Sequence, residues 1–369
     1  MISLRRLHVH FGREQPTPFR EPSICRTGAH AKRLMGAACR RHRGCPRFRR
    51  ESRGRYDACM RVFVTGGAGF LGSHVASVLL RAGHQVTVYD NLSTGHRRLV
   101  PAGAAFIKAD LKHQARLAQA LPGHDAVIHL AALVPVPVSI ERPVAFAENN
   151  VVNTVRLMEE MRAAGVRRII FSSSATVYGL PRALPLREED PLGVQSNPYG
   201  ATKIAAEAFV AVYNRLYGFD ATVLRYFNPY GPNELCEPET HAIPNIVRAA
   251  LEDRPVPIYW KGEQVRDFIY VEDLAEAHTS VLGLPGLNYF NVGTEKGVKV
   301  KDVLSVVTDI LDRPVRIDDR GERPGDVPAL YASAAKLRKA TGWEAKTSLE
   351  EGLRRTVEFY RTEQMRRAG

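Results

Sequence analysis

A glycine-rich turn between a predicted strand and a predicted helix constrains this chain more than any other feature. Residues 61–65 form an apolar, β-branched run, and Gly66, Gly69 and Gly72 follow it at a spacing of three residues. Glycines at this place permit a tight turn and let a backbone approach a pyrophosphate, whose charge meets N–H groups at the helix start. The strand and helix around it favour a dinucleotide-binding βαβ unit over a merely tight turn.

The residues after Met60 alternate between strand and helix patterns, as a parallel sheet requires. Strands are predicted at 61–65, 85–89, 105–108, 126–130, 168–172 and 221–226, and helices up to about 82, around 147–163, at 198–217 and near 349–361. We therefore expect an α/β fold with a doubly wound parallel (Rossmann) sheet at 60–228. Residues 229–369 are expected to be mainly a smaller C-terminal α/β substrate lobe, with elements returning to the sheet.

The net charge of +13 is concentrated in the first 59 residues. They hold 15 Lys+Arg against 4 Asp+Glu, which leaves +2 for the other 310 residues. This segment has no helix or strand period and too little apolar content to order, so we expect 1–59 to be disordered. Because Met60 directly precedes the first strand, 1–59 is interpreted as a mis-annotated extension, with an organellar transit peptide as the alternative.

The remaining chain resembles an ordinary soluble protein without a nucleic-acid or membrane partner. Its charge is nearly neutral, and no apolar run approaches the roughly 18 residues that a membrane span needs. Cys236 is the only cysteine after residue 59, which suits a reducing cytoplasm. The cysteine and histidine spacings match no paired-ligand pattern, so no metal is expected.

Two aspartates stand at the ends of predicted strands. Asp90, after the second strand, can accept hydrogen bonds from the adenosine ribose hydroxyls and would repel a 2′-phosphate, which favours NAD over NADP. Asp110, after the third strand, could similarly meet the adenine, or it could cap a helix.

Tyr199 and Lys203 lie four residues apart, and therefore on one face of a predicted helix. Ser174 follows a predicted strand and would face the same cleft. Lowering a tyrosine pKa from about 10 by about 3 units takes about 4 kcal/mol, which a cation about 4 Å away supplies at an effective dielectric of about 20. Lys203 and the positive charge of a nicotinamide are therefore expected to give a tyrosinate that takes a hydroxyl proton. Without the other motifs, Tyr199 and Lys203 would be interpreted as surface residues of an amphipathic helix.

Further motifs accompany this constellation, namely Leu130-Ala131-Ala132, Asn149-Asn150, Phe171 to Gly179, Arg225 to Pro229 and Val265 to Phe268. Together they closely resemble the extended short-chain dehydrogenases of the NAD-dependent epimerase/dehydratase family, which act on nucleotide sugars. Within that family the resemblance, over residues 60–361, is greatest to the UDP-hexose 4-epimerases.

The resemblance implies roles for individual residues. Ser174 and Tyr199 would hold the sugar 4-hydroxyl, with Tyr199 as the base, and Lys203 would bind the nicotinamide ribose. The predicted NAD contacts are Gly66, Gly69, Phe70, Leu71, Gly72, Asp90, Asn91, Asp110, Leu111, Leu130, Ala131, Ala132, Asn149, Tyr199, Lys203 and Phe227. The predicted UDP-sugar contacts are Ser174, Asn228, Tyr259, Arg266, Arg323, Asp326 and Leu330.

The implied reaction is epimerisation at C4 by oxidation, rotation of the 4-keto sugar and re-reduction, with NAD retained. Decarboxylases and 4,6-dehydratases of the family carry an acid just after the catalytic hydroxyl, whereas Ala175 and Thr176 stand here. Leu330 occupies a position where a bulky Tyr is associated with restriction to UDP-glucose and UDP-galactose. We therefore expect UDP-N-acetylhexosamines to be accepted as well, unless Leu330 merely packs against the final helix.

Several alternatives stay open at this point. The segment between Pro229 and Arg266 is short, and His241-Ala242 stands where well-known epimerases have Asn and Leu, which leaves the sugar in doubt. A UDP-uronate or dTDP-sugar epimerase, a 4-keto reductase and a non-catalytic NAD-binding scaffold are the alternatives. A homodimer through the helices around 147–163 and 199–217 is a family expectation.

Overall fold

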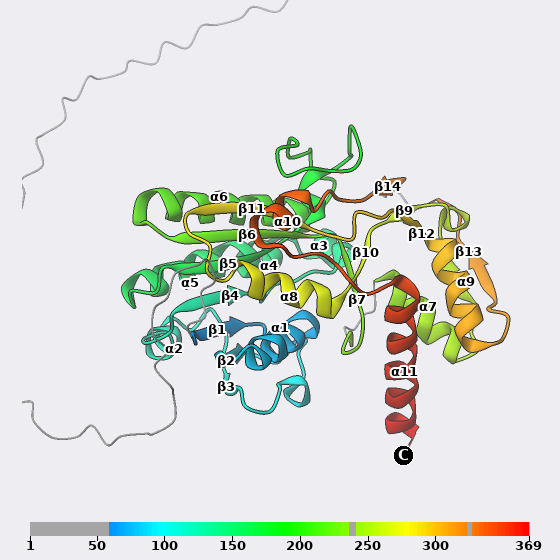
Figure 1. Cartoon of the computed structure of the whole chain (residues 1–369), viewed down its shortest axis with the longest axis horizontal. Helices are drawn as coiled ribbons and strands as arrows, with labels where there is room; N and C mark the ends of the chain where they lie inside the picture. The colour runs from blue at the N-terminus through cyan, green and yellow to red at the C-terminus, as the bar shows by residue number, and fades with distance from the viewer. Residues whose placement is uncertain (1–58, 236–240, 323–326, 369) are drawn as a thin grey trace, which may run out of the picture. The chain divides into compact units, whose positions relative to one another are not determined.

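The computed structural model describes residues 59–235, 241–322 and 327–368, all of which belong to one compact unit. The prediction made for residues 1–59 lies outside the described residues, except for its last residue. A seven-stranded parallel sheet with the order β11-β6-β5-β4-β1-β2-β3 forms the centre of the unit (Figure 1). Its strands are β1 (Arg61–Thr65), β2 (Gln85–Asp90), β3 (Ala105–Lys108), β4 (Ala126–His129), β5 (Arg168–Ser174), β6 (Asp220–Tyr226) and β11 (Leu287–Val292).

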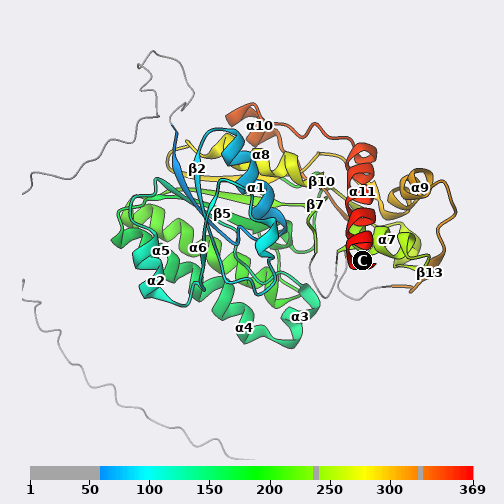
Figure 2. The ribbon, with the colours of Figure 1, turned by 90° about the horizontal axis from the view of Figure 1, so that it is seen from below.

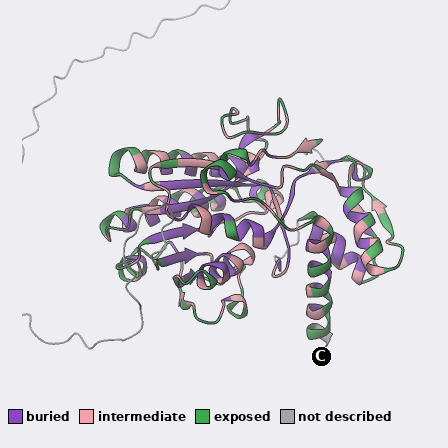
Figure 3. Cartoon of the chain, in the orientation of Figure 1, coloured by how far each residue is buried: buried purple, intermediate pink, exposed green. Residues whose placement is uncertain are grey.

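Helices cover both faces of the sheet, as Figure 2 shows. Helices α1 (Phe70–Arg81) and α8 (Val271–Val281) lie on one face, and α2 (Gln114–Ala120), α5 (Asn153–Ala163) and α6 (Pro198–Tyr217) lie on the other. Alternate side chains of β1 serve the two layers, because Val62 and Val64 pack toward α1 and α8 whereas Phe63 packs toward α5 and α6. The strands are therefore buried on both faces (Figure 3).

The helix predicted around 147–163 differs in the structure. It is preceded by α3 (Val136–Glu141) and α4 (Pro143–Ala147), and a π-helical turn at Glu148–Val152 separates α4 from α5. The Asn150 amide in this turn accepts from Leu133 N–H at 2.8 Å and donates to Leu133 C=O at 2.9 Å. A π turn holds one extra residue, a feature common at functional sites, and here it places Asn149 in the wall of a cavity.

The C-terminal lobe is built from short strands and three longer helices. Strand β8 (Val256–Ile258) pairs with β13 (Ile317–Asp319), β7 (Asn228–Tyr230) pairs with β10 (Phe268–Tyr270), and β9 (Val265–Arg266) lies between β12 (Val298–Lys299) and β14 (Ala329–Leu330). Helices α7 (Ala242–Leu251), α9 (Val300–Leu311) and α11 (Leu349–Ala368) enclose an apolar core beside these strands. The short helix α10 (Ala335–Thr341) packs beside β11.

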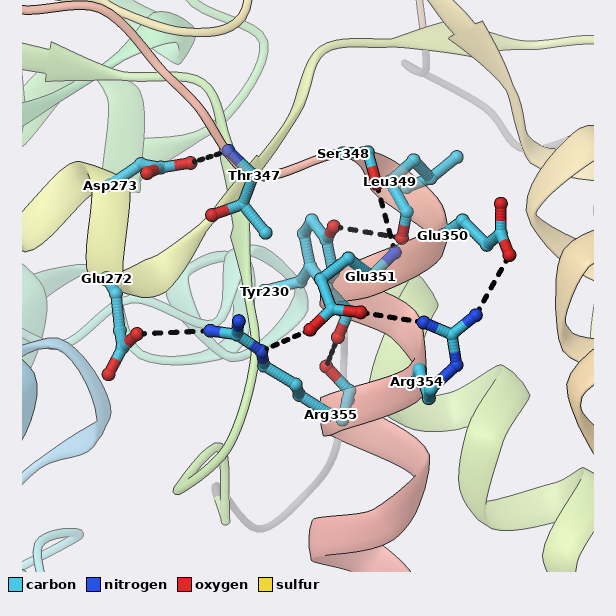
Figure 4. Close-up of polar contacts among 12 residues, drawn as sticks. Tyr230, Glu272, Asp273, Thr347, Ser348, Leu349, Glu350, Glu351, Arg354 and Arg355 are labelled. Carbon is cyan, nitrogen blue, oxygen red and sulfur yellow. Dashed lines mark hydrogen bonds and ion pairs between the residues drawn. The ribbon is translucent and has the colours of Figure 1, made fainter.

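The last helix links the lobe to the sheet domain. The carboxylate of Asp273 on α8 accepts from Thr347 N–H at 2.9 Å, and Glu272 pairs with Arg355 at 3.5 Å (Figure 4). Farther along α11, Glu363 pairs with Arg98 at 2.7 Å. Helix α11 continues to Ala368, past the predicted end near 361.

None of the helices within the described ranges is both long and apolar enough to cross a membrane. The described residues also contain no group of three or more His, Cys, Asp or Glu side chains that could hold a metal ion.

Candidate active site

A cavity of about 1130 Å³ lies at the carboxyl ends of the parallel strands and reaches into the lobe. This is the place where open α/β sheets bind their ligands. The predicted residues that line it are Gly66, Gly69, Phe70, Leu71, Gly72, Asp90, Asn91, Asp110, Leu111, Leu130, Ala131, Ala132, Asn149, Ser174, Tyr199, Phe227, Asn228, Tyr259, Arg266 and Leu330. The predicted contacts Arg323 and Asp326 lie outside the described residues.

The glycine turn after β1 leaves no room for side chains except toward the cavity. A Cβ on Gly72 would lie 2.1 Å from Gly66 O, and one on Gly66, whose φ is +72°, would lie 2.7 Å from Ala131 N. At Gly69, in contrast, the nearest atom to such a Cβ is 3.4 Å away. Gly69 is the N-cap of α1, which has no side-chain cap, so first-turn N–H groups remain for an anion. This cradle fits the pyrophosphate of a dinucleotide.

Asp90 and Asp110 lie on neighbouring strands above this cradle. The Asp90 carboxylate accepts from Ala68 N–H at 3.0 Å and from Leu92 N–H at 2.8 Å, which fixes it at the end of β2. Asp110 accepts from Lys112 N–H at 2.9 Å and from Asn91 Nδ2 at 2.9 Å. Burial raises the Asp110 pKa, but these bonds outweigh it and lower the pKa. Helix α2 has no side-chain cap, so the capping alternative for Asp110 is wrong.

Ser174 and Tyr199 meet at the cavity wall. Asn197 caps α6 by accepting from Gly200 N–H at 2.9 Å, which sets the first turn that carries Tyr199. Ser174 ends β5 and accepts from Thr176 N–H at 3.3 Å, and its hydroxyl lies close enough to the Tyr199 phenol to lower the pKa of that phenol. A hydroxyl that donates to the phenol oxygen favours the deprotonated phenol, which is the direction in which Ser174 shifts the Tyr199 pKa.

In the structure, burial moves the pKa values of Tyr199 and Lys203 in the directions that disfavour the tyrosinate and ammonium that proton transfer needs. Burial raises the Tyr199 pKa to about 12, and only the Ser174 hydrogen bond opposes it. Burial lowers the Lys203 pKa to about 8, although the Glu207 carboxylate raises it. Lys203 donates to Ser172 C=O at 2.7 Å and does not line the cavity. Lowering of the tyrosine pKa therefore stays a prediction for the NAD-bound protein.

Some cavity residues escaped the sequence analysis. The Tyr226 phenol donates to His278 Nε2 at 2.6 Å, since His278 Nδ1 donates to Leu274 C=O at 3.0 Å. Tyr226 precedes Phe227 in the motif from Arg225 to Pro229, so the sequence could have predicted that Tyr226 lies at the cavity. Further lining residues without such a signal are Gln195, Glu234, Gln264 and Arg320, whereas His241, which also lines the cavity, had been singled out in the sequence.

The Leu330 side chain lines the cavity from β14 and packs beside Phe227 and Ala175. It is not part of the apolar cluster that contains α11. The alternative in which Leu330 merely packs against the final helix is therefore wrong.

A Rossmann sheet with a glycine cradle and a Ser–Tyr pair backed by a buried Lys defines a dinucleotide-dependent enzyme of the short-chain dehydrogenase type. The chain matches the model of the NAD dependent epimerase/dehydratase family over residues 62–293. A UDP-glucose 4-epimerase of Rhizobium leguminosarum bv. trifolii is 38% identical over 318 residues, which cover 81% of this chain and 97% of that relative. The chain therefore belongs to the NAD-dependent epimerase/dehydratase family.

Solved structures agree with this assignment. UDP-glucose 4-epimerase of Thermus thermophilus, in complex with NAD, is 36% identical with a TM-score of 0.76, over 82% of this chain and 99% of that one. UDP-N-acetylglucosamine 4-epimerase of Methanobrevibacter ruminantium, in complex with UDP-N-acetylmuramic acid, is 32% identical with a TM-score of 0.78, over 83% and 99%. The predicted family, fold class and NAD-dependent enzyme class are confirmed.

Proposed function

We propose that this protein is an NAD-dependent UDP-glucose (UDP-galactose) 4-epimerase. The observation that carries the proposal is that Ser174 and Tyr199 meet at the cavity with Ala175 and Thr176 next to them, rather than an acid. No carboxylate at these two positions can move a C5 proton or assist loss of a leaving group. A 4-keto sugar formed here can therefore only be reduced again at C4. The name of the Rhizobium relative supports the same substrate.

The chain's own residues prepare and direct the reaction. Tyr199 takes the proton of the sugar 4-hydroxyl and later returns it, and Ser174 orients that hydroxyl by hydrogen bonding. Lys203, which donates to Ser172 C=O, would instead hold the nicotinamide ribose when NAD is bound and would add positive charge beside the phenol. NAD, when bound in the cradle, supplies the acceptor and the donor for the C4 hydrogen.

The lobe anchors the nucleotide while the sugar turns. Asn228, Tyr259 and Arg266 line the cavity from the lobe side of the sheet and are proposed to bind the UDP part, together with Arg323 and Asp326. An arginine suits a diphosphate because its fork of donors binds two oxygens at once. With UDP held and the sugar free to rotate, either face of C4 can be presented.

Leu330 supports a broader range of substrates. It lines the cavity where the resemblance implies a gatekeeper beside the sugar C2 substituent. Leu is shorter than Tyr, so an acetamido group is expected to fit, and a relative named UDP-N-acetylglucosamine 4-epimerase supports this breadth.

A homodimer in the cytoplasm completes the proposal. Exposed apolar side chains on the α5 and α6 side of the molecule include Val152 at 41%, Phe209 at 41%, Val212 at 39% and Leu216 at 59%. Helices α5 and α6 of two copies would bury them against one another.

A substrate panel tests the proposal. Purified protein is incubated separately with UDP-galactose, UDP-N-acetylgalactosamine, UDP-glucuronate and dTDP-glucose, and the products are identified by NMR. We expect C4 epimers of the first two. Turnover restricted to UDP-glucuronate or dTDP-glucose would replace the proposed substrate, and no epimer from any sugar would contradict the activity.

A further inference from the structure

Three consecutive serines at the end of β5 each face a different residue of α6. Ser172 C=O accepts from Lys203 Nζ at 2.7 Å, and the Ser173 hydroxyl donates to Glu207 Oε1 at 2.5 Å, while the Ser174 hydroxyl lies beside the Tyr199 phenol and lowers its pKa. Tyr199, Lys203 and Glu207 are spaced by four residues and so share one face of the helix. The end of β5 therefore contacts α6 at three successive helical turns. The proposed chemistry uses Tyr199 and Lys203 but not Glu207.

Glu207 belongs to a buried ion pair that has no part in binding ligands. Arg225 on β6 donates to it through Nε at 3.1 Å and through a terminal nitrogen at 2.8 Å, and the two side chains are only 5% and 3% exposed. Neither residue lines the cavity. A buried ion pair is costly to desolvate and contributes little to stability over an apolar replacement, so stability alone is a weak reason for it.

Arg225 is itself held from the other side. Its second terminal nitrogen donates to Tyr178 Oη at 3.0 Å and to Glu188 C=O at 3.2 Å. Tyr178 Oη in turn donates to Asn291 Oδ1 at 2.6 Å on β11. The Glu207 carboxylate therefore cannot swing away from β5 without breaking its bonds to Ser173 and to Arg225, which is itself held in place.

Lys203 depends on a nearby negative charge, because the residue is only 3% exposed. Burial lowers its pKa to about 8, and the charge that raises it belongs to Glu207, one helical turn away. Tyr199 faces Lys203 from the same helix, and the titratable or charged groups on neighbouring elements are His129, Arg225 and Tyr289, with Tyr178 against Arg225. His129 accepts from Thr65 Oγ1 and its pKa is about 3, so it stays neutral near pH 7.

We propose that Glu207 is a positioning residue that, clamped by Ser173 and Arg225, keeps the Lys203 ammonium charged and holds Lys203 and Tyr199 opposite Ser174. The part of this inference that concerns turnover rests on the proposed epimerase function. The part that concerns the charge of Lys203 is a property of the fold and is tested separately.

The first test replaces Glu207 by its neutral isostere, Glu207→Gln. Loss of a unit charge one helical turn away, at an effective dielectric of about 20, moves a pKa by about one to two units. We expect the alkaline limb of the kcat profile with UDP-galactose to move to lower pH by that amount, so that kcat at pH 8 falls about five- to fiftyfold. The difference from the wild type narrows as the pH falls, and KM changes little.

A second readout does not need turnover. Binding of NADH is followed by its fluorescence between pH 6 and 9, and in Glu207→Gln the weakening of binding at high pH should begin about one to two pH units lower. This experiment still tests the charge of Lys203 if UDP-galactose proves not to be a substrate.

Two further variants separate positioning from folding. Glu207→Gln combined with Arg225→Met removes both charges and avoids an unpaired buried arginine. The alkaline limb of its kcat profile should still lie at lower pH than that of the wild type. Glu363→Gln breaks the Glu363–Arg98 pair, whose residues do not line the cavity, and should leave both profiles unchanged. Profiles of the two Glu207 variants that run parallel to the wild type at every pH, with or without a lower melting temperature, would overturn the inference.

Discussion

Tyr199 is the residue on which the chemistry depends, and its surroundings favour the neutral phenol. Burial raises its pKa to about 12, which is about five units above neutral pH and corresponds to about 7 kcal/mol. Lys203, at 5.8 Å from the ring centroid, does not offset this in its contact with Ser172. The phenol is therefore expected to become a base only when Lys203 and a bound positive charge act together.

Tyr199→Phe tests this role. We expect kcat to fall by about 10²- to 10⁴-fold, the usual contribution of a general base, while the melting temperature and NAD content stay near the wild type. Tyr217→Phe, on the same helix but outside the cavity lining, is the matched control and should retain full activity. Near-normal turnover in Tyr199→Phe would show that another group takes the proton.

Leu330→Tyr tests the limit on the C2 substituent. The larger ring should fill the room beside C2, so kcat/KM for UDP-N-acetylglucosamine should fall at least about tenfold while that for UDP-glucose changes little. Steady-state kinetics on both sugars decide the matter. No acetamido-sugar activity in the wild type, or an equal loss on both sugars, would remove Leu330 as the gatekeeper.

At the level of elements, the glycine turn contributes both to the packing of the fold and to the cofactor site. Gly72→Ala puts a Cβ 2.1 Å from Gly66 O, so the backbone must shift and the free energy of unfolding should fall by roughly 1–3 kcal/mol. Gly69→Ala has no such clash inside the chain but projects into the cavity. It should keep the stability of the wild type and weaken NAD binding.

Denaturant unfolding and NAD titration of the two variants separate these effects. Equal loss of stability in both variants would contradict the assignment of Gly69 to ligand approach and of Gly72 to packing.

The strands were predictable because buried parallel strands are short apolar runs between glycines and polar turns. Strand β3 has its predicted bounds, and β5 extends only from the predicted end at 172 to Ser174. The π turn at Glu148–Val152 was not predicted, since one extra residue changes the apolar spacing very little. Arg320 was missed for another reason: it reaches the cavity only through the tertiary placement of a lobe segment.

On the scale of the whole molecule, the exposed apolar side chains of α5 and α6 predict self-association. Leu216→Glu should shift the mass measured by light scattering from two chains toward one, because a charge would be buried at the contact. Leu287→Glu replaces an apolar residue that is 36% exposed on β11 and should leave the mass unchanged. A wild-type mass of one chain would contradict the dimer.

The most direct test of the central claim follows the hydrogen at C4. In the proposed reaction this hydrogen leaves C4 and returns to C4 of the same sugar, because sugar and one resident NAD stay in the same site. Protein purified without added cofactor is incubated with UDP-galactose carrying deuterium at C4, and the product is examined by NMR and mass spectrometry. We predict UDP-glucose that retains the deuterium at C4 through many turnovers. Loss of the deuterium to solvent, or release of a 4-keto sugar with reduction of added NAD, would contradict it.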